Sequence, residues 1–437
     1  MITKLNFTDH TIKSYAIRKL TPKECFRLMG VRDNVIGTMQ SSNAQAAERL
    51  PGWNGKGNPE DMAISASQQY KQAGNSIVVD VLAHIYEQLF YPAPPKPRPG
   101  SQLSLFDDLE DTLPAMPTDA DKNEEKIFLT TFSGYDSQLM AADVLREWHP
   151  DFRWTCKGWS DIDKYACQMH NLVFPQFADC ALGDITKIDW HKVKRSLDGR
   201  EVDLFTYSSP CQDISQAGKQ MGLQEGSDTR SALLWRVADA VEVLRPKYLL
   251  QENVAALVSQ KFMPDFQKWL DKLSSLGYVS RWARLNAKNY GVPQNRDRVF
   301  CISMRRDVAF DYRFPEPFEL KTRLEDVLEE EVSDRYFLKD DAVSKFLKAN
   351  DSDNALFVQF DLPPTHEAAM FLKTWLTLRM NALNGWEREL DELRDCIENE
   401  RDVFNSDFAS FNECHTFPCE GFEELFKENM ERKKDGV

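Results

Sequence analysis

The chain has 437 residues, of which 42% are hydrophobic and 28% are charged. These proportions are ordinary for a folded protein of two or three domains, and no apolar run reaches the roughly 18 residues of a membrane span. The formal net charge is −15, which at first argues against a nucleic-acid partner. However, residues 307–437 hold 16 Lys and Arg against 32 Asp and Glu, so the rest of the chain is nearly neutral and a basic cleft there stays possible.

Segment 1–91 is predicted to close with an amphipathic helix. Its apolar residues recur at helical spacing at Ile77, Val78, Val81, Leu82, Ile85 and Leu89. Residues 92–125 follow and are rich in Pro and acidic residues, which is typical of an exposed linker. The nine cysteines form no CxxC pair, and the N-terminus lacks the apolar stretch of a signal peptide. We therefore expect reduced thiols and a cytoplasmic location.

Residues 126–310 alternate strand-like and helical patterns. This alternation predicts an α/β fold with a mostly parallel sheet and helices on both faces. Helices are expected at Ser231–Leu244 and Met263–Leu276. The expected strands are Ile127–Phe132, Phe152–Cys156, Val202–Tyr207, Tyr248–Gln251, Tyr278–Arg284 and Val299–Met304. Ligands of such sheets bind beyond the carboxyl ends of the strands, so polar residues there are the first candidates for a site.

The tail, residues 311–437, has a different character. Trp386, Leu390, Leu393 and Ile397 form a helical stripe among acidic residues, and no repeat or membrane-spanning pattern is visible. We expect a separate, smaller region here.

A cysteine follows the third expected strand in Ser208-Ser209-Pro210-Cys211-Gln212. A thiolate in a polar loop at a strand end can act as a nucleophile, although a lone cysteine is more often an idle small hydrophobe. Glu252 follows the next strand in Gln251-Glu252-Asn253-Val254. Its carboxyl can serve as a general acid or hydrogen-bond partner, whereas capping of the next helix is the blander interpretation.

Two arginines follow a Gly-Val-Pro turn in the segment 289–300. Alternation puts Arg296 and Arg298 on one face of a strand, where two guanidinium groups suit phosphate or carbonyl recognition. The blander interpretation is an exposed strand with its charges in water. Taken together and in this order, the Pro-Cys, Glu-Asn-Val and Gln-x-Arg-x-Arg motifs resemble those of the DNA (cytosine-5) methyltransferase family.

The resemblance implies a Rossmann-like sheet that binds S-adenosyl-L-methionine, and a chain that methylates C5 of cytosine in double-stranded DNA. Cys211 would be the nucleophile, Glu252 would hold the base edge, Arg296 would contact the flipped nucleotide and Arg298 would support the pocket. The residues that resemble the family's cofactor contacts are Phe132, Gly134, Asp161, Ile162, Asp184, Ile185 and Pro210, with Asn75 and Ser76 from the N-terminal segment. Residues 218–230 resemble the loop that closes over DNA.

The motif order is unusual. Residues 18–30 and 70–76 resemble the family's ninth and tenth motifs, which usually follow the recognition region but here precede the first motif. The resemblance thus implies a circular permutation, with residues 92–125 joining the old ends. The first motif keeps only Gly134 of its glycines, and partial substitution by Asp136 is an open hypothesis.

The acidic tail leaves alternatives open. Region 311–437 is expected to recognise the DNA target, to be a degenerate recognition region, or to bind a protein partner. The chain as a whole is expected to be an enzyme, while a non-catalytic or partner-dependent DNA-binding protein, an RNA cytosine-5 methyltransferase and an unrelated nucleotide-binding fold are the alternatives.

Overall fold

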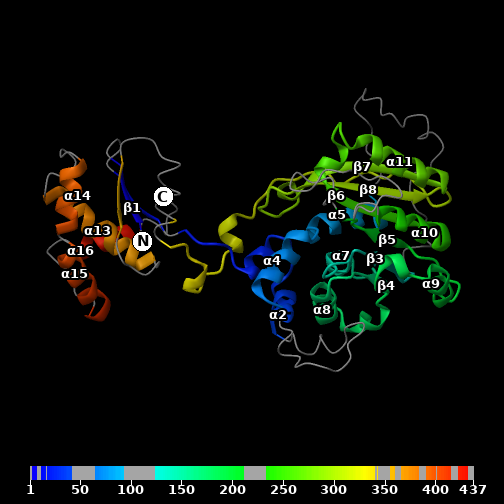
Figure 1. The fold of residues 1–437 in the computed structure, drawn as a ribbon, viewed down its shortest axis with the longest axis horizontal. Coiled ribbons are helices and arrows are strands. Elements are labelled where there is room, and N and C mark those ends of the chain that lie inside the picture. Colours follow the sequence, from blue (N-terminus) through cyan, green and yellow to red (C-terminus); the bar gives the residue numbers. More distant parts are fainter. Residues whose placement is uncertain are drawn as a thin grey trace. The chain divides into compact units, whose positions relative to one another are not determined.

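The computed structural model describes residues 2–6, 11–15, 17–41, 64–92, 124–210, 233–339, 342, 355–359, 366–382, 390–399, 401–414 and 422–431. Two compact units can be distinguished (Figure 1). The larger unit is Pro22–Leu328, and the smaller one combines Met1–Thr21 with Glu329–Val437. The predicted domain boundaries at 91, 125 and 310 stay predictions.

The larger unit is built on a six-stranded sheet with the strand order β4-β3-β5-β6-β8-β7. Strands β4, β3, β5 and β6 run parallel, while β8 is antiparallel to both β6 and β7. The strands are β3 (Lys126–Thr131), β4 (Trp154–Ser160), β5 (Leu204–Tyr207), β6 (Tyr248–Val254), β7 (Tyr278–Asn286) and β8 (Asp297–Arg305). The predicted mostly parallel α/β sheet is confirmed.

Helices cover both faces of this sheet, because its central strands are apolar on both sides. In β3, Phe128 belongs to one hydrophobic core, and Ile127 and Leu129 belong to the other. The first core is completed by α5 (Val79–Phe90), α7 (Ser137–Trp148) and α8 (Lys164–Val173). The second is completed by α9 (Trp190–Ser196), α10 (Leu234–Leu244) and α11 (Met263–Ser275).

The segment before the linker packs into the first of these cores. It contributes α1 (Pro22–Arg27), α2 (Asp33–Ser41), α4 (Ala66–Asn75) and α5. The predicted apolar stripe lies on α5 and just before it, and Val81, Leu82, Ile85 and Leu89 are buried. Helix α5 packs directly on α7.

All six strands differ from their predicted ranges by at least one residue, and the largest extensions at the carboxyl end are those of β4 and β6. Strand β4 continues to Ser160, beyond the expected end at Cys156, because its pairing with β3 runs through Trp159 and Ser160. Strand β6 continues to Val254, since the antiparallel partner β8 goes on pairing where the parallel neighbour β5 has ended. Glu252 therefore lies within a strand rather than after it.

Short 3-10 turns connect several elements of the larger unit. They are η3 (Pro175–Cys180), η4 (Ile185–Lys187), η6 (Ala255–Val258), η7 (Ala287–Asn289) and η8 (Leu324–Val327).

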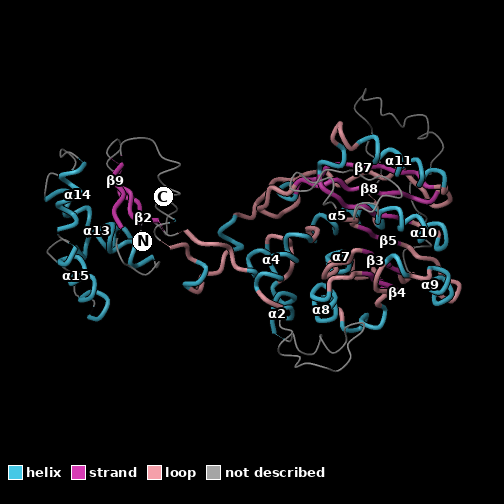
Figure 2. Tube along the Cα trace, in the orientation of Figure 1, coloured by secondary structure: helices cyan, strands magenta, loops and turns pink. Residues whose placement is uncertain are grey.

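The smaller unit joins segments from distant parts of the sequence (Figure 2). Its antiparallel sheet has β1 (Ile2–Asn6) between β2 (Thr11–Tyr15) and β9 (Ala355–Gln359). The turn η9 (Asp334–Tyr336) and helices α13 (His366–Ala382), α14 (Leu390–Asn399), α15 (Arg401–Cys414) and α16 (Phe422–Glu431) complete it. A separate aromatic core includes Phe371, Phe404, Phe411 and Phe422. Of the predicted tail stripe, Ile397 is buried and Trp386 lies outside the described residues.

Within the described part of the chain, none of the helices combines the length and hydropathy that crossing a membrane requires.

Candidate active site

The loop between β3 and α7 carries the first group of predicted site residues. Phe132, Gly134 and Asp136 all have left-handed backbone conformations, with φ of 54°, 59° and 68°. Such conformations are costly for residues other than glycine, so contacts elsewhere must hold the loop. A Cβ atom added to Gly134 would meet no atom within 4 Å, so the backbone here borders open space among the described residues.

The segment after β4 lies against this loop. The amide of Gly134 donates a 2.8 Å hydrogen bond to Asp161 Oδ2, and the amide of Asp163 donates one of 2.8 Å to Asp161 Oδ1. Burial raises the pKa of Asp161, although these amide donors lower it in part. Each carboxylate oxygen can accept a further hydrogen bond, so ribose hydroxyls are suitable additional donors.

Ile162 is 76% exposed, which is a large exposed fraction for an aliphatic side chain beside a half-buried carboxylate. Its neighbour Asp163 caps α8 by accepting from the amides of Tyr165 and Ala166. Asp163 also forms a 2.6 Å ion pair with Lys71 of α4. The N-terminal segment is thereby attached to the strand end that carries the predicted ribose ligand.

Asp184 and Ile185 lie at the start of η4. Asp184 accepts from the amide and the hydroxyl of Thr186, at 3.0 Å and 2.8 Å, and these hydrogen bonds lower its pKa. Ile185 is only 6% exposed and belongs to the second core. Ser160 Oγ donates a 2.6 Å hydrogen bond to the Gly183 carbonyl, which fixes this turn beside the end of β4.

Glu252 is the buried carboxylate of the candidate active site. Its Oε1 lies 3.2 Å from Nε of Arg298, a residue paired across the antiparallel β6–β8 ladder with Val254. Burial raises the pKa of Glu252, and the positive charges of Arg298 and Arg296 offset only part of that increase. The adjacent Asn253 side chain donates to the Ser209 carbonyl at 3.3 Å, which ties the end of β6 to the loop after β5.

That loop is described as far as Pro210, which is half-buried. Cys211 and the predicted closing loop at 218–230 lie outside the described residues. Ser209, two residues before Cys211 in the sequence, contacts the strand of Glu252 through Asn253.

Arg296 lies at the junction of the N-terminal segment and the sheet. Its Nη2 donates hydrogen bonds of 2.8 Å to the Gly74 carbonyl and 2.6 Å to the Ser76 carbonyl. Ser76 is the C-cap of α4, and Asn75 beside it is exposed. The structure thus brings Arg296 into contact with Ser76, and Asn75 lies in the sequence between the two residues whose carbonyls Arg296 binds.

One feature of the site has no counterpart among the predicted residues. His170 of α8 lies 3.4 Å from the Asp136 carboxylate, and neither side chain has exposed surface. The sequence suggests Asp136 only as a partial substitute for the missing glycines, and His170 lies in no recognisable motif. A buried His at helical spacing carries no sequence signal that distinguishes it from an ordinary core residue.

The described site residues offer a carboxylate for hydroxyl groups, an exposed aliphatic surface, open space beside a glycine, and a buried acid between two arginines. Such a set suits a nucleoside-containing ligand on one side and a planar base with polar edges on the other.

Comparisons with known proteins agree with this chemistry. A sequence model of C-5 cytosine-specific DNA methylases matches residues 2–91 and 146–382. The type II methyltransferase M2.ScrFI of Lactococcus lactis subsp. cremoris is 47% identical over 162 residues, or 37% of this chain and 43% of that protein. The orphan methyltransferase M.SssI of Spiroplasma monobiae is 48% identical over 114 residues, or 25% of this chain and 29% of that protein.

The matched stretches span less than half the length of these two relatives. Among solved structures, the S. pombe Dnmt2 methyltransferase has 18% sequence identity and a TM-score of 0.39, with 51% of this chain and 66% of that chain covered.

Proposed function

Because the chain belongs to the C-5 cytosine-specific DNA methylase family, we propose that it transfers a methyl group from S-adenosyl-L-methionine to C5 of cytosine in double-stranded DNA. The observation that carries the proposal is the buried Glu252 carboxyl, held by Arg298 beside the strand end that leads to Cys211. Its raised pKa suits an acid that must carry or share a proton at a base edge near neutral pH.

The proposed chemistry starts with a cytosine flipped out of the duplex, because its ring atoms are inaccessible inside it. The thiolate of Cys211 forms a bond to C6 while Glu252 stabilises a proton at N3, so that the ring accepts the electron pair. The electron-rich C5 then takes the methyl group. Loss of the C5 proton and breakage of the sulfur–C6 bond restore the aromatic ring and free the thiolate.

When bound, S-adenosyl-L-methionine would supply the electrophilic methyl group. The described residues fit it: Asp161 suits the ribose hydroxyls, exposed Ile162 offers an apolar surface for the adenine, and Gly134 leaves space for close approach. Asp184 would accept from the adenine amino group. The remaining proposed contacts are Phe132, Ile185, Pro210, Asn75 and Ser76.

We also propose that the chain is a circular permutant. Residues 22–92 pack in the same unit as the sheet, and Arg296 binds the end of α4 directly. Residues 92–125 would then be the linker that joins the old ends, at little entropic cost if those ends lie close together. Residues 126–310 would form the catalytic domain.

Double-stranded DNA is the proposed partner, and residues 311–437 are proposed to recognise its target. The acidity of this region makes a protein partner the alternative for its surface. We place the reaction in the cytoplasm, where the cysteines would stay reduced.

The experiment is methyl transfer from radiolabelled S-adenosyl-L-methionine to unmethylated duplex DNA of mixed sequence. Wild type should label DNA, whereas Cys211→Ala and Cys211→Ser should not, although both should bind the cofactor as wild type does. Cys396→Ser, in α14, is the matched control and should retain transfer. Turnover by Cys211→Ser would refute the nucleophile assignment.

The same assay separates the alternatives. Label entering a structured RNA in preference to DNA would identify an RNA methyltransferase. Cofactor binding and DNA binding without any transfer would identify a non-catalytic or partner-dependent protein.

A further inference from the structure

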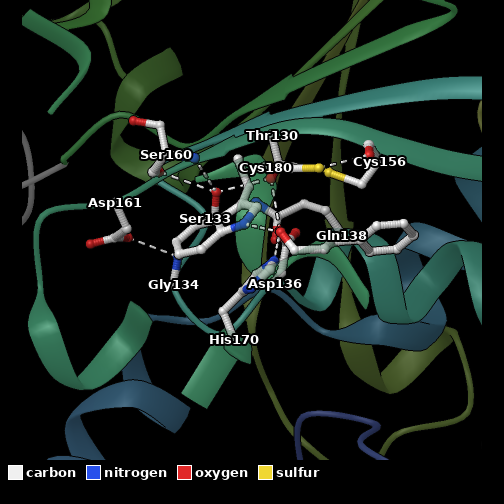
Figure 3. A network of polar contacts seen from close by, with 12 residues as sticks. Thr130, Ser133, Gly134, Asp136, Gln138, Cys156, Ser160, Asp161, His170 and Cys180 are labelled. Atoms are coloured by element: carbon white, nitrogen blue, oxygen red, sulfur yellow. Dashed lines mark hydrogen bonds and ion pairs between the residues drawn. The ribbon is translucent and has the colours of Figure 1, made fainter. Parts of the chain in front are cut away.

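A buried polar cluster lies beneath the β3–α7 loop (Figure 3). The hydroxyl of Thr130 donates a 2.8 Å hydrogen bond to Asp136 Oδ2, and Nε2 of His170 lies 3.4 Å from the same oxygen. Thr130, Asp136 and His170 all have 0% exposed surface. The carboxylate thus points into the protein rather than toward the first turn of α7, although Asp136 occupies the N-cap position of that helix and makes no side-chain cap there.

The imidazole of His170 is held by aromatic neighbours. It stacks on Trp159 of β4 with ring centroids 3.9 Å apart and an angle of 22°. Phe174, which follows α8, approaches the same ring at 5.5 Å. His170 is therefore a fixed partner, and its position is set by β4 and α8 rather than by the loop it touches.

The Asp136–His170 contact is the deepest of three links between the same two segments. Above it, Ser133 exchanges hydrogen bonds with the end of β4, through its amide to the Ser160 carbonyl at 3.0 Å and through its Oγ. Nearest to the open space, the Gly134 amide binds Asp161. All three links join the loop after β3 to the continuous stretch from the end of β4 to α8, which includes Asp161 and Ile162.

A fully buried contact between a carboxylate and an imidazole is a poor device for stability alone, because buried polar atoms that lack hydrogen-bond partners cost free energy. Among the described residues, Asp136 Oδ1 and both ring nitrogens of His170 have no hydrogen-bond partner, so the 3.4 Å approach of the two side chains is a close contact and the cluster is not optimised as a polar core. The loop above it needs an external constraint, since Phe132 and Asp136 are both left-handed without being glycine. If the Asp136–His170 contact serves to select one conformation of the β3–α7 loop, it accounts both for the unpaired polar atoms and for the left-handed backbone of Phe132 and Asp136.

We propose that Asp136 and His170 are positioning residues that hold the β3–α7 loop in its cofactor-binding conformation. The pair rests on the proposed function, because it acts on the proposed S-adenosyl-L-methionine pocket. Additional glycines would let the backbone adopt this loop conformation, whereas here side-chain contacts hold it. They keep the Gly134 amide within hydrogen-bonding distance of Asp161, so that the binding site is formed before the cofactor binds. Neither residue touches the cofactor itself.

Two substitutions of Asp136 separate the effect of its carboxylate from the effect of its left-handed backbone conformation. Asp136→Asn keeps a residue that tolerates the left-handed region, and Asp136→Gly adopts that region freely, yet both remove the negative charge. If the carboxylate holds the loop, both variants should bind S-adenosyl-L-methionine about 10- to 100-fold more weakly in calorimetric titration. If only the backbone angle matters, Asp136→Gly should bind as well as wild type.

The double variant Asp136→Asn/His170→Met guards against loss of folding, since it removes the carboxylate and the imidazole together and leaves neither one buried alone. It should retain the fold and still show the weakened binding. Asp203→Asn is the matched control: Asp203 is buried, pairs with Lys247 at 3.0 Å and accepts from the Ile127 amide, but lies at the opposite ends of the strands. It should lower the melting temperature without changing cofactor affinity.

The titration also distinguishes positioning from simple destabilisation. A positioning role changes the dissociation constant while the number of sites stays near one per chain, and it raises the cofactor KM while kcat at saturation changes less than about three-fold. Reduced site number with unchanged affinity would overturn the proposal, as would wild-type affinity in the folded double variant. If wild type itself bound no cofactor, the proposed function would fail instead.

Discussion

The guanidinium of Arg296 connects the N-terminal segment to the sheet, so Arg296→Lys tests whether that connection shapes the cofactor pocket. Lysine keeps the positive charge but replaces the planar fork with a single ammonium group on a more flexible stem. We expect the end of α4, with Asn75 and Ser76, to lose its fixed position relative to the strand ends.

The magnitude follows from the two hydrogen bonds to the Gly74 and Ser76 carbonyls. Hydrogen bonds from a charged donor contribute about 1.5–3 kcal/mol each when buried. Gly74 is exposed and Ser76 is half-buried, so water can replace part of the loss, and about 2 kcal/mol in total is a reasonable expectation. If all of it is expressed in binding, the affinity for S-adenosyl-L-methionine falls roughly 30-fold.

Isothermal titration calorimetry with S-adenosyl-L-methionine measures this directly. Arg284→Lys is the control, because Arg284 forms an exposed ion pair with Asp297 on the neighbouring strands, and exposed pairs contribute only about 0–1 kcal/mol. An Arg296→Lys variant that binds the cofactor as tightly as wild type would show that the contact with α4 has no part in the pocket.

Glu252→Gln should lower methyl transfer about 100-fold or more at pH 7. Burial raises the folded-state pKa of Glu252 above its ordinary 4.5, so the stability that this carboxyl contributes is lost as pH rises through the raised value. The free energy of unfolding measured in urea should therefore decrease with pH in the wild type relative to the Glu252→Gln variant. Ile162→Ser should weaken cofactor binding about five-fold in titration without lowering the melting temperature, because Ile162 is exposed. Gly30→Ala should cost about 2 kcal/mol in thermal unfolding, since φ is +74° and the new Cβ would meet the Asp80 carboxylate, whereas exposed Gly37→Ala in α2 should stabilise by about 0.5–1 kcal/mol. A destabilising Gly37→Ala or a neutral Gly30→Ala would contradict this reasoning.

Much of the larger unit could be predicted because its signals are local. Strands such as Lys126–Thr131 are buried on both faces and have apolar residues at their centre. The motifs near the strand ends are contiguous in the sequence, so their resemblance to the family does not depend on tertiary contacts. Strand limits were harder, since they depend on the partner strand. Trp159 and Ser160 lie beyond the predicted strand end at Cys156, yet pairing with β3 makes them part of the strand.

The rest of the site depends on contacts between distant residues. Nothing near His170 in the sequence reveals that Asp136 will meet it in the core, because the pairing is created by the packing of α8 against β4. Likewise, no local pattern in Ile2–Asn6 indicates that it will pair with Ala355–Gln359. Patterns predict which face of an element is buried, but not which distant element buries it.

The position of β1 has a consequence for biosynthesis. As the middle strand of the smaller sheet, it needs both β2, which follows at once, and β9, which emerges from the ribosome about 350 residues later. At roughly 5–20 residues per second, one edge of the nascent β1–β2 hairpin waits about 20–70 s for its partner. An open strand edge is a template for unwanted pairing. The residues of the larger unit are synthesised between β1 and β9, so this edge of β1 is available for pairing with another chain until β9 is made.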